Sequence, residues 1–291
     1  MHDTLIILAG GLSSRMKSSE ASPELTMSEI KQANKREKGI IQVGKKRRPF
    51  LDYLLYNAQN AGYTKIIIVT GEDNNLFRRF YGFADSGNDF HGLDISYSIQ
   101  KIPAGREKPL GTADALLLAL ETYTYLKETE FSMCNSDNLY SEKALKLVMA
   151  EDSPNTFIAY DAETLHLPAE KILRFAVTLV NEAGYLTDIL EKPISADLKK
   201  FGDSNGRIRV SMNLFKFSGA SIYTYLLKCP VNEIRGEKEI QTAIINMIRD
   251  FPESMISIPL AEPVPDLTYK DDIADVSAFL DEMYPVLEWP S

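Results

Sequence analysis

Two glycines and an arginine follow a short apolar run near the start of the chain. The run Leu5–Ala9 ends at Gly10 and Gly11, and Arg15 comes four residues later. Glycines at the end of a buried strand let backbone N–H groups approach a ligand closely, and an arginine adds a charged donor for phosphate oxygens. The segment lacks the third glycine of a dinucleotide fingerprint and the ending of a Walker loop. It therefore favours a phosphate site of another kind, with an ordinary glycine turn as the alternative.

Two aspartates are candidates for holding Mg²⁺. Asp137 comes just after the apolar run Phe131–Asn135, and Asp266 lies near an expected strand-to-helix junction. Mg²⁺ in phosphate sites is usually held by one or two carboxylates together with substrate oxygens. The pair therefore predicts a magnesium site, although Asp137 could also be a turn residue and Asp266 a helix cap.

Two further segments could contact a phosphorylated ligand. Gly111-Thr112 precedes a long helical pattern, where backbone N–H groups could bind an oxygen-rich ligand, unless Thr112 is only an N-cap. Glu191-Lys192 stands before Pro193, which disfavours helix at Lys192. An extended pair of this kind could bind a sugar hydroxyl and a phosphate, or could be an ordinary surface pair.

The first half of the chain alternates strands and helices. Strands are expected at residues 5–9, 65–70, 93–99 and 131–135, with a short one at 39–43; helices are expected at 49–61, 112–126 and 141–149. This alternation predicts a mostly parallel sheet covered on both faces. Ligands of such sheets bind at the carboxyl ends of the strands, so we expect Gly10, Gly111 and Asp137 to converge.

The second half is less regular. Strands are expected at residues 157–160, 173–180, 185–190, 209–217 and 255–258, and helices at 220–227, 239–249 and 271–283. The sequence contains no internal repeat, low-complexity segment or linker that would mark a boundary. We therefore expect a single domain over residues 1–291.

Composition excludes several classes of protein. The net charge of −9 over 291 residues disfavours wholesale binding of nucleic acid, although the segment from Lys31 to Arg48 carries eight cations against one acid, Glu37. This basic segment suits a small anionic ligand, or is a solvated loop. Two distant cysteines predict no disulfide framework, and the N-terminal apolar run is too short for a secretion signal or a membrane span. We expect a cytoplasmic protein without a membrane partner.

In sequence order these segments resemble the sugar-1-phosphate nucleotidyltransferases, the family that makes nucleotide-activated sugars. The resemblance covers nearly the whole chain and rests on the following segments: Leu8–Met16 (the Gly-rich loop), Lys38–Val43 with Arg48–Leu51 (a lysine, a short strand and a helix start), Pro109–Ala115 (the Leu-Gly-Thr-Ala turn), Asn135–Asp137 (the metal motif), Glu191–Pro193 (identical to the family's Glu-Lys-Pro), Met212-Asn213 (the sugar pocket) and Pro265–Ile273 (the closing aspartate segment). The chain departs from the family in a longer loop after Met16, in Ser13-Ser14 for Gly-Thr, and in Arg48 for a lysine.

The resemblance implies a Rossmann-like three-layer α/β/α fold, whose central mixed sheet is predominantly parallel and carries a smaller antiparallel extension on the sugar side. Residues 1–150 would form the nucleotide-binding half, and residues 151–291 the sugar-binding half with the closing metal segment. The implied reaction joins a sugar-1-phosphate to a nucleoside triphosphate by Mg²⁺-dependent in-line transfer and releases pyrophosphate. The implied residues are Arg15, Lys38 and Lys192 for catalysis; Ala9, Gly10, Gly11, Gln100, Gly111 and Thr112 for the nucleotide, with Gln100 able to read a pyrimidine edge; Glu191 and Asn213 for the sugar; and Asp137 and Asp266 for Mg²⁺.

Two other functions are compatible with these segments. One is nucleotidyl transfer to a non-sugar acceptor, such as an alcohol phosphate, a choline-type phosphate or a molybdopterin cofactor; another is a non-catalytic subunit that binds a nucleotide-sugar. Glu191–Pro193 and the chain length argue against the first, and the retained cations and aspartates argue against the second. A homo-oligomer is compatible with the sequence. The polar stretch at residues 17–37 is expected to form a mobile lid, with a docked helix as the alternative.

Overall fold

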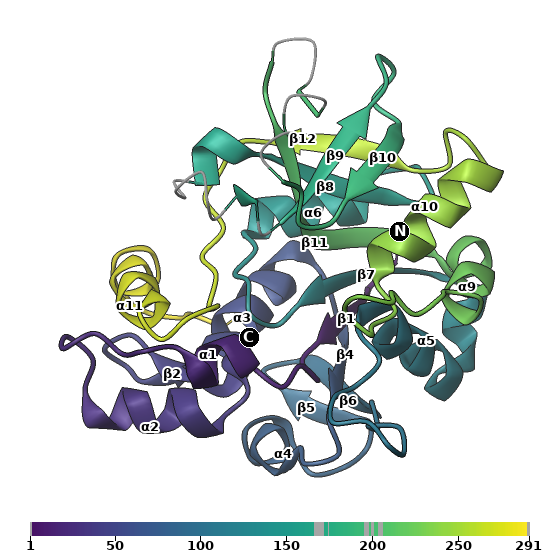
Figure 1. Cartoon of the computed structure of the whole chain (residues 1–291). Helices are drawn as coiled ribbons and strands as arrows, with labels where there is room; N and C mark the ends of the chain where they lie inside the picture. The colour runs from purple at the N-terminus through teal and green to yellow at the C-terminus, as the bar shows by residue number, and fades with distance from the viewer. Residues whose placement is uncertain are drawn as a thin grey trace.

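The computed structural model describes residues 2–165, 172–173, 175–194, 198, 201–202 and 206–289 (Figure 1). Ten strands of the described chain form one mixed sheet: β1 (Thr4–Leu8), β4 (Lys65–Thr70), β5 (Asn88–Phe90), β6 (Leu93–Ile99), β7 (Glu130–Asn135), β8 (Thr156–Asp161), β9 (Ala176–Val180), β10 (Leu186–Leu190), β11 (Arg209–Ser218) and β12 (Ile256–Leu260). A separate two-stranded ribbon pairs β2 (Gln42–Val43) with β3 (Arg48–Pro49). The main path of the sheet runs β10-β9-β11-β7-β1-β4-β6-β5, and β8 and β12 join through β11.

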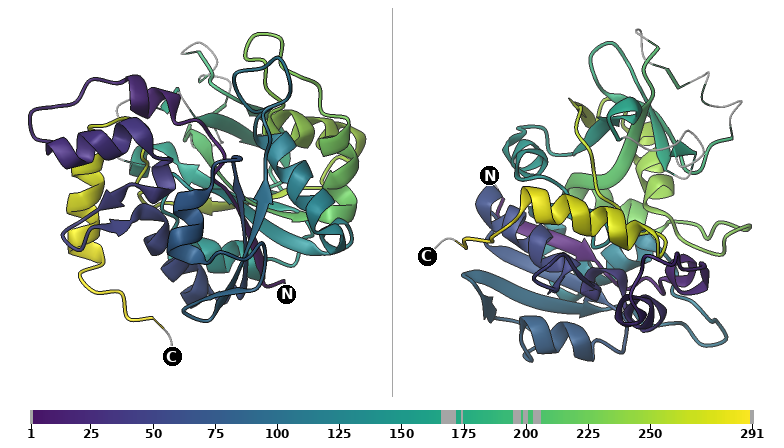
Figure 2. Two further views of the ribbon diagram at one scale, coloured as in Figure 1. Left: turned by 90° about the horizontal axis from the view of Figure 1, so that it is seen from below. Right: turned by 90° about the vertical axis from the view of Figure 1, so that its left-hand side faces the viewer.

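Helices cover both faces of this sheet. The α-helices among the described residues are α1 (Ser14–Ser18), α2 (Met27–Lys35), α3 (Phe50–Ala61), α4 (Asn75–Tyr81), α5 (Thr112–Thr122), α6 (Glu142–Ala150), α9 (Gly219–Leu227), α10 (Ile240–Asp250) and α11 (Asp272–Met283). Single turns of 3₁₀-helix occupy Lys38–Ile40, Thr124–Lys127 and Ala162–Leu165. Figure 2 shows the three layers from two further directions.

Strand β1 is buried on both faces, which explains why its sequence is continuously apolar. Leu5 and Ile7 belong to the core cluster that includes α3 and α6, whereas Ile6 and Leu8 belong to the cluster formed with α5, α9 and α10. Successive side chains of a strand point to opposite faces, so a strand covered on both sides needs apolar residues at every position.

The parallel part of the sheet brings four strand ends to one edge. Strand β1 pairs in parallel with β4 and with β7, and β4 pairs in parallel with β6. Their carboxyl ends are Leu8, Thr70, Ile99 and Asn135. The expected convergence of the loops that follow these strands is therefore built into the topology.

The second half adds antiparallel strands through one long strand. Strand β11 pairs antiparallel with β7, β8 and β9, and its register against β8 shifts between Ser211 and Phe215. The residues after the shift pair with β7, and those before it pair with β9. This irregularity lets one strand connect the parallel sheet to the antiparallel extension, and the expected fold class is confirmed.

Some expected boundaries are wrong. The strand expected at residues 39–43 is a 3₁₀ turn followed by only two strand residues, and the helix expected at 112–126 ends at Thr122. The strand expected at 173–180 begins at Ala176, and residue 174 lies outside the described residues. The sequence does not predict the short elements α1, α4 and β5. These elements have five, seven and three residues, which is too few for a recognisable hydrophobic periodicity.

The segment between α1 and β2 is packed against the protein. Leu25 and Ala33 are buried and Ile30 is partly buried in the same core cluster, whereas Met27 is 81% exposed. Thr26 begins α2 with a reciprocal capping box to Glu29, and α11 lies against β2 (Figure 2). The structure thus has the docked arrangement, and opening of this segment stays a prediction.

Candidate active site

A pocket of about 460 Å³ lies at the carboxyl edge of the parallel strands. The predicted residues that line it are Ala9, Gly10, Gly11, Arg15, Lys38, Gln100, Gly111, Thr112, Asp137 and Lys192. Three other predicted residues, Glu191, Asn213 and Asp266, are not among its lining residues. The volume lies within the range of sites for small ligands.

The loop after β1 forms one wall of the pocket. A Cβ atom on Gly10 would lie 3.3 Å from Gln100 Oε1 and 3.4 Å from the carbonyl carbon of Thr70, so the loop packs closely on its neighbours here. A Cβ on Gly11 would have no atom within 4 Å and would point into free space. Ser13 has a φ of 56°, and Arg15 is carried on the short helix α1 rather than on an open loop.

Gln100 is buried beside this loop, and both of its amide hydrogens have partners. Its Nε2 atom donates to Gly111 O at 3.0 Å and to Asp114 Oδ2 at 2.8 Å. Since both partners are acceptors, the orientation of the amide is fixed, and Oε1 is the atom next to Gly10. Gln100 therefore offers the pocket an acceptor.

Position 111 requires a glycine, both because of its backbone conformation and because a neighbouring segment lies close to it. Its φ is 102°, and a Cβ atom would lie 2.7 Å from Lys238 O. Thr112, the first residue of α5, accepts a hydrogen bond from Ile240 N at 3.0 Å with its hydroxyl. Thr112 is thus not an N-cap: its side chain joins α5 to the start of α10.

One backbone hydrogen bond and one side-chain hydrogen bond join the segments that carry the two predicted metal ligands. Leu267 N donates to Asp137 O at 2.9 Å, and Asn138 Nδ2 donates to Asp266 Oδ1 at 3.0 Å. Burial and the negative charge of Asp137 raise the pKa of Asp266 to about 6. A buried carboxylate that lies beside a second carboxylate is suited to share a cation with it, so these residues fit Mg²⁺.

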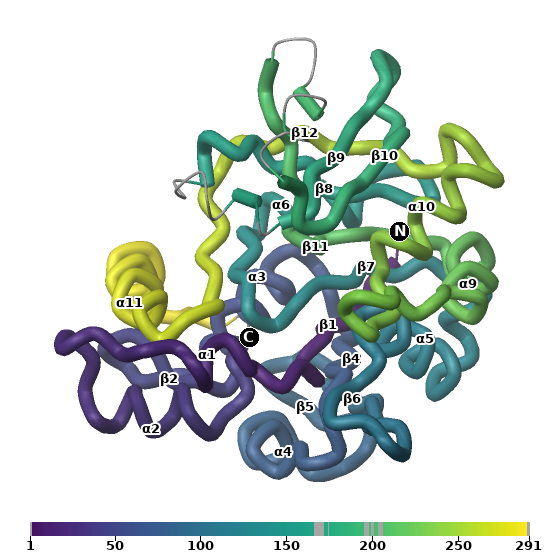
Figure 3. Tube along the Cα trace, viewed as in Figure 1, coloured from purple at the N-terminus to yellow at the C-terminus, as the bar shows by residue number. Residues whose placement is uncertain are grey.

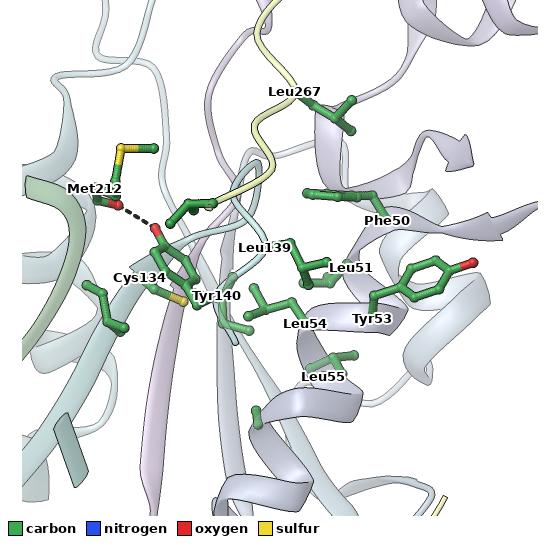
Figure 4. Close-up of a cluster of buried hydrophobic side chains, with 14 of the residues drawn as sticks. Phe50, Leu51, Tyr53, Leu54, Leu55, Cys134, Leu139, Tyr140, Met212 and Leu267 are labelled. Carbon is green, nitrogen blue, oxygen red and sulfur yellow. Dashed lines mark hydrogen bonds between the residues drawn. The ribbon is translucent and has the colours of Figure 1, made fainter. Parts of the chain in front are cut away.

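Hydrophobic anchors fix both aspartates. Leu139 and Leu267, which flank the aspartates in sequence, pack in the cluster with Leu51 and Leu54 of α3 (Figure 4). In the same cluster the Tyr140 hydroxyl donates to Met212 O at 2.6 Å. The carboxylates therefore stand on rigid core rather than on a free loop.

Lys38 is the cation nearest to this pair. Its Nζ atom lies 2.8 Å from Asp137 Oδ2, and its side chain is only 9% exposed. Burying a lysine is costly unless it is paired, so the contact with Asp137 explains its position. Lys38 lies in the 3₁₀ turn that follows α2.

Glu191, which is predicted to contact the sugar, belongs to a second group of charged side chains around Arg235. Glu191 Oε1 lies 3.7 Å from Arg235 Nη1, and Glu239 Oε1 lies 2.8 Å from Arg235 Nε. Burial raises the pKa of Glu191 to about 7, although the charges of Arg235 and Lys192 oppose the shift. Lys192 has a φ of 51° and is exposed at the pocket.

Asn213 is held away from the pocket lining. Its Oδ1 atom accepts from Gln241 Nε2 at 2.9 Å, and its φ is 61°. Backbone in the left-handed region at non-glycine residues is uncommon and tends to cluster at functional sites. Three of the described residues with this conformation, Ser13, Lys192 and Asn213, belong to predicted site segments.

Two charged residues of the pocket wall, Lys108 and Glu237, were not predicted from the sequence. Lys108 and Glu237 line the pocket, and Lys108 Nζ donates to Glu237 Oε1 at 2.8 Å and to Arg235 O at 2.6 Å. Lys108 stands directly before the Pro109–Ala115 turn, and that position was the available signal. Glu237 carried none, because it comes close only through the turn before α10.

No cluster of three or more metal-ligating His, Cys, Asp or Glu side chains exists in the part of the chain that the structure describes. Among the same residues, no helix combines the length and the apolar character needed to cross a bilayer. Cys134 and Cys229 are buried as free thiols.

A family model described as nucleotidyl transferase matches residues 4–281. The D-glycero-alpha-D-manno-heptose 1-phosphate guanylyltransferase of Aneurinibacillus thermoaerophilus is 27% identical over 135 residues, which make up 46% of this chain and 46% of that protein. The alignment thus spans about half the length of this curated relative.

Two solved structures share the fold. A putative glucose-1-phosphate thymidylyltransferase from Bacillus anthracis, in complex with a sucrose, superposes with a TM-score of 0.65 at 17% identity over 96% of each chain. A UDP-glucose pyrophosphorylase complexed with UDP-glucose gives a TM-score of 0.71 at 14% identity, over 97% of this chain and 99% of that one. At these identities the likeness concerns the fold.

Proposed function

Because this chain belongs to the nucleotidyl transferase family, we propose that it joins a sugar-1-phosphate to a nucleoside triphosphate and releases pyrophosphate. The proposal rests on one observation: Lys38, Asp137 and Asp266 lie close together at a pocket that is also lined by Arg15 and Lys192. Residues 1–291 would act as one unit, since strands from both halves share one sheet.

The proposed chemistry needs positioning and charge neutralisation more than covalent catalysis. An oxygen of the sugar phosphate attacks the α-phosphorus in line, the bond from the α-phosphorus to the bridging oxygen breaks, and pyrophosphate leaves with both bonding electrons. Arg15 would hold the leaving phosphates, and Lys192 would hold the sugar phosphate. No general base is required, because the attacking phosphate is already ionised.

Asp137 and Asp266 would hold the Mg²⁺ ion. When bound, the ion would neutralise charge on the α-phosphate. Lys38 would hold Asp137 in place and add a positive charge near the triphosphate. Glu191 and Asn213 would approach the sugar hydroxyls; for Asn213 this requires exchange of its present partner, Gln241.

The arrangement of Gln100 supports a base that carries an exocyclic amino group. Uracil and thymine present two carbonyls around a single N–H, so a glutamine pairs with them best when it also donates. Here both amide hydrogens of Gln100 are taken by Gly111 and Asp114, and its Oε1 can only accept. Guanine is the base we favour among the amino-bearing bases, in keeping with the name of the partly aligned guanylyltransferase.

A panel of nucleoside triphosphates and sugar-1-phosphates tests the proposal by Mg²⁺-dependent pyrophosphate release. We expect release only when both substrates are present, with GTP preferred over UTP and dTTP. A preference for UTP or dTTP would overturn the role of Gln100 and leave the transfer reaction standing. Absence of release with every pair would favour a non-catalytic nucleotide-sugar-binding protein. Release with a non-sugar phosphate alone would move the acceptor to another class.

A further inference from the structure

The proposed reaction uses only Lys38 of the basic segment, Lys31 to Arg48, and leaves the other cations of this segment without a role. Several of these cations surround a pocket of about 290 Å³ between α2 and β2, which lie side by side in Figures 1 and 3. The lining residues are Ser28, Lys31, Gln32, Lys35, Arg36 and Gln42. None of them lines the catalytic pocket.

The positive charge of this pocket is not compensated by the protein. Within the described parts of the chain, no carboxylate lies within 4.0 Å of a side-chain nitrogen of Lys31, Lys35 or Arg36. Burial and the positive charges of Arg47 and Arg79 lower the pKa of Arg36. Like charges are thus held together in a protein whose net charge is −9, and an anion would relieve their repulsion.

Hydrogen bonds hold the polar groups of the pocket in place. Arg36 Nη1 donates to Gln32 Oε1 at 2.7 Å, and the same oxygen accepts from Gln42 N at 3.1 Å. Gln32 is buried, so it joins α2 to β2 across the pocket. Arg47, whose φ is 49°, donates from Nη2 to Ser28 Oγ at 2.8 Å. Groups fixed in advance lose less entropy on binding a ligand.

The pocket is joined to the catalytic site by a short stretch of chain. Arg36 and Gln42 both line the pocket, and the five residues between them include Lys38. Lys38 Nζ lies 2.8 Å from Asp137 Oδ2. A ligand that bridges α2 and β2 would therefore fix the segment that carries Lys38.

We propose that this pocket is a second anion site, which takes inorganic phosphate or a small phosphate monoester and stabilises the position of Lys38 in the catalytic pocket. The volume holds a phosphate with a small attached group and is too small for a nucleotide-sugar. The expected effect on turnover depends on the proposed transfer reaction, whereas binding of the anion to this pocket does not depend on it.

Hydrogen exchange of residues 27–42, with and without ligand, tests binding. The probes are inorganic phosphate and a hexose 6-phosphate, whose phosphate is not on the anomeric carbon. We expect protection of roughly tenfold at ten times the dissociation constant, and binding weakened about tenfold or more in Lys31→Ala/Lys35→Ala. Protection by one probe only identifies the source of the phosphate group.

Two controls separate this pocket from the catalytic pocket and from bulk charge. Lys45→Ala/Lys46→Ala removes the same charge from exposed positions of the same segment and should leave protection unchanged. Arg15→Ala weakens the catalytic phosphate site and should also leave protection in place. The anion site would be overturned if the ligand gave no protection from hydrogen exchange in the wild type. It would also be overturned if either control variant lost that protection. Binding of a polyglutamate peptide, with no effect of either phosphate probe, would overturn it in favour of an acidic polymer.

Turnover tests the coupling to Lys38. Hexose 6-phosphate should raise pyrophosphate release severalfold in the wild type and in Lys45→Ala/Lys46→Ala, but not in Lys31→Ala/Lys35→Ala. Protection without a change in turnover would overturn the coupling. Protection in a protein that releases no pyrophosphate with any substrate pair would instead overturn the proposed function and leave the anion site standing.

Discussion

At the scale of single residues, the proposed mechanism depends on Asp137, which contacts Lys38 and would also hold Mg²⁺. Asp137 contacts Lys38 at 2.8 Å and stands beside Asp266. We expect Asp137→Asn to reduce turnover by ~10²-fold or more at moderate Mg²⁺, because one ligand charge is lost while the anchors around it stay in place. Pyrophosphate release and thermal unfolding measure the two effects.

The matched control is Asp275→Asn, which removes the same charge from an exposed position on α11. It should leave turnover unchanged. Near-normal turnover of Asp137→Asn at saturating Mg²⁺ would remove Asp137 from the metal site.

A second prediction at the scale of single residues concerns Lys192, which is proposed to hold the sugar phosphate. Lys192 follows Glu191 in the chain and lines the pocket, and its backbone has a φ of 51°. Lys192→Ala should lower kcat/KM for the sugar-1-phosphate, which corresponds to a loss of roughly 2–4 kcal/mol of transition-state stabilisation. The effect on kcat/KM for the triphosphate should be smaller. The exposed Lys143→Ala on α6 is the control. Unchanged sugar-phosphate kinetics would make Glu191-Lys192 an ordinary surface pair.

At the scale of elements, two glycines of the pocket have different tasks. Gly111 joins the loop to α5 with a φ of 102°, and a Cβ there would lie 2.7 Å from Lys238 O, whereas a Cβ on Gly11 would meet no atom within 4 Å. Gly111→Ala should therefore destabilise the fold by roughly 1–3 kcal/mol. Gly11→Ala should leave stability unchanged and weaken triphosphate binding, because its methyl group would enter the pocket.

Urea unfolding and nucleotide titration separate these outcomes. If Gly111→Ala kept full stability, the junction of α5 with the turn before α10 would not depend on glycine. If Gly11→Ala bound the triphosphate normally, the ligand would not approach the loop backbone.

At the scale of the whole molecule, stability should depend jointly on pH and Mg²⁺. The pKa of Asp266 is about 6 in the folded protein and lies near 3.8 in the unfolded chain. The unfolded chain thus loses this proton first, so the metal-free protein should lose stability as the pH rises from about 4 to about 6. If Mg²⁺ binds the ionised pair as proposed, it should restore stability, more at pH 7.5 than at pH 5.

Thermal unfolding across this pH range, with Mg²⁺ and with a chelator, measures the effect. In Asp266→Asn the loss of stability between pH 4 and 6 should shrink, and so should the gain from Mg²⁺. An equal gain from Mg²⁺ at pH 5 and pH 7.5 would contradict the assignment of Asp266 to the metal.

The sequence by itself determined the alternation of elements and most of the pocket. The continuous apolar run of β1 predicts a strand covered on both faces, because such a strand has no polar side. Parallel strands end at one edge, so the alternation of strands and helices predicts that Gly10, Gly111 and Asp137 converge, and all three line the pocket. Local periodicity and the topology of parallel sheets suffice for such features.

Only the tertiary structure decided how the site is completed. Arg235 approaches Glu191 and Glu237 approaches Lys108 across more than 40 residues of sequence, and no local pattern encodes these contacts. The use of both amide hydrogens of Gln100 likewise depends on where α5 places Asp114. The pocket at α2 exists because Gln32 joins two elements. Contacts of this kind follow from packing, which fixes distances that spacing along the chain leaves free.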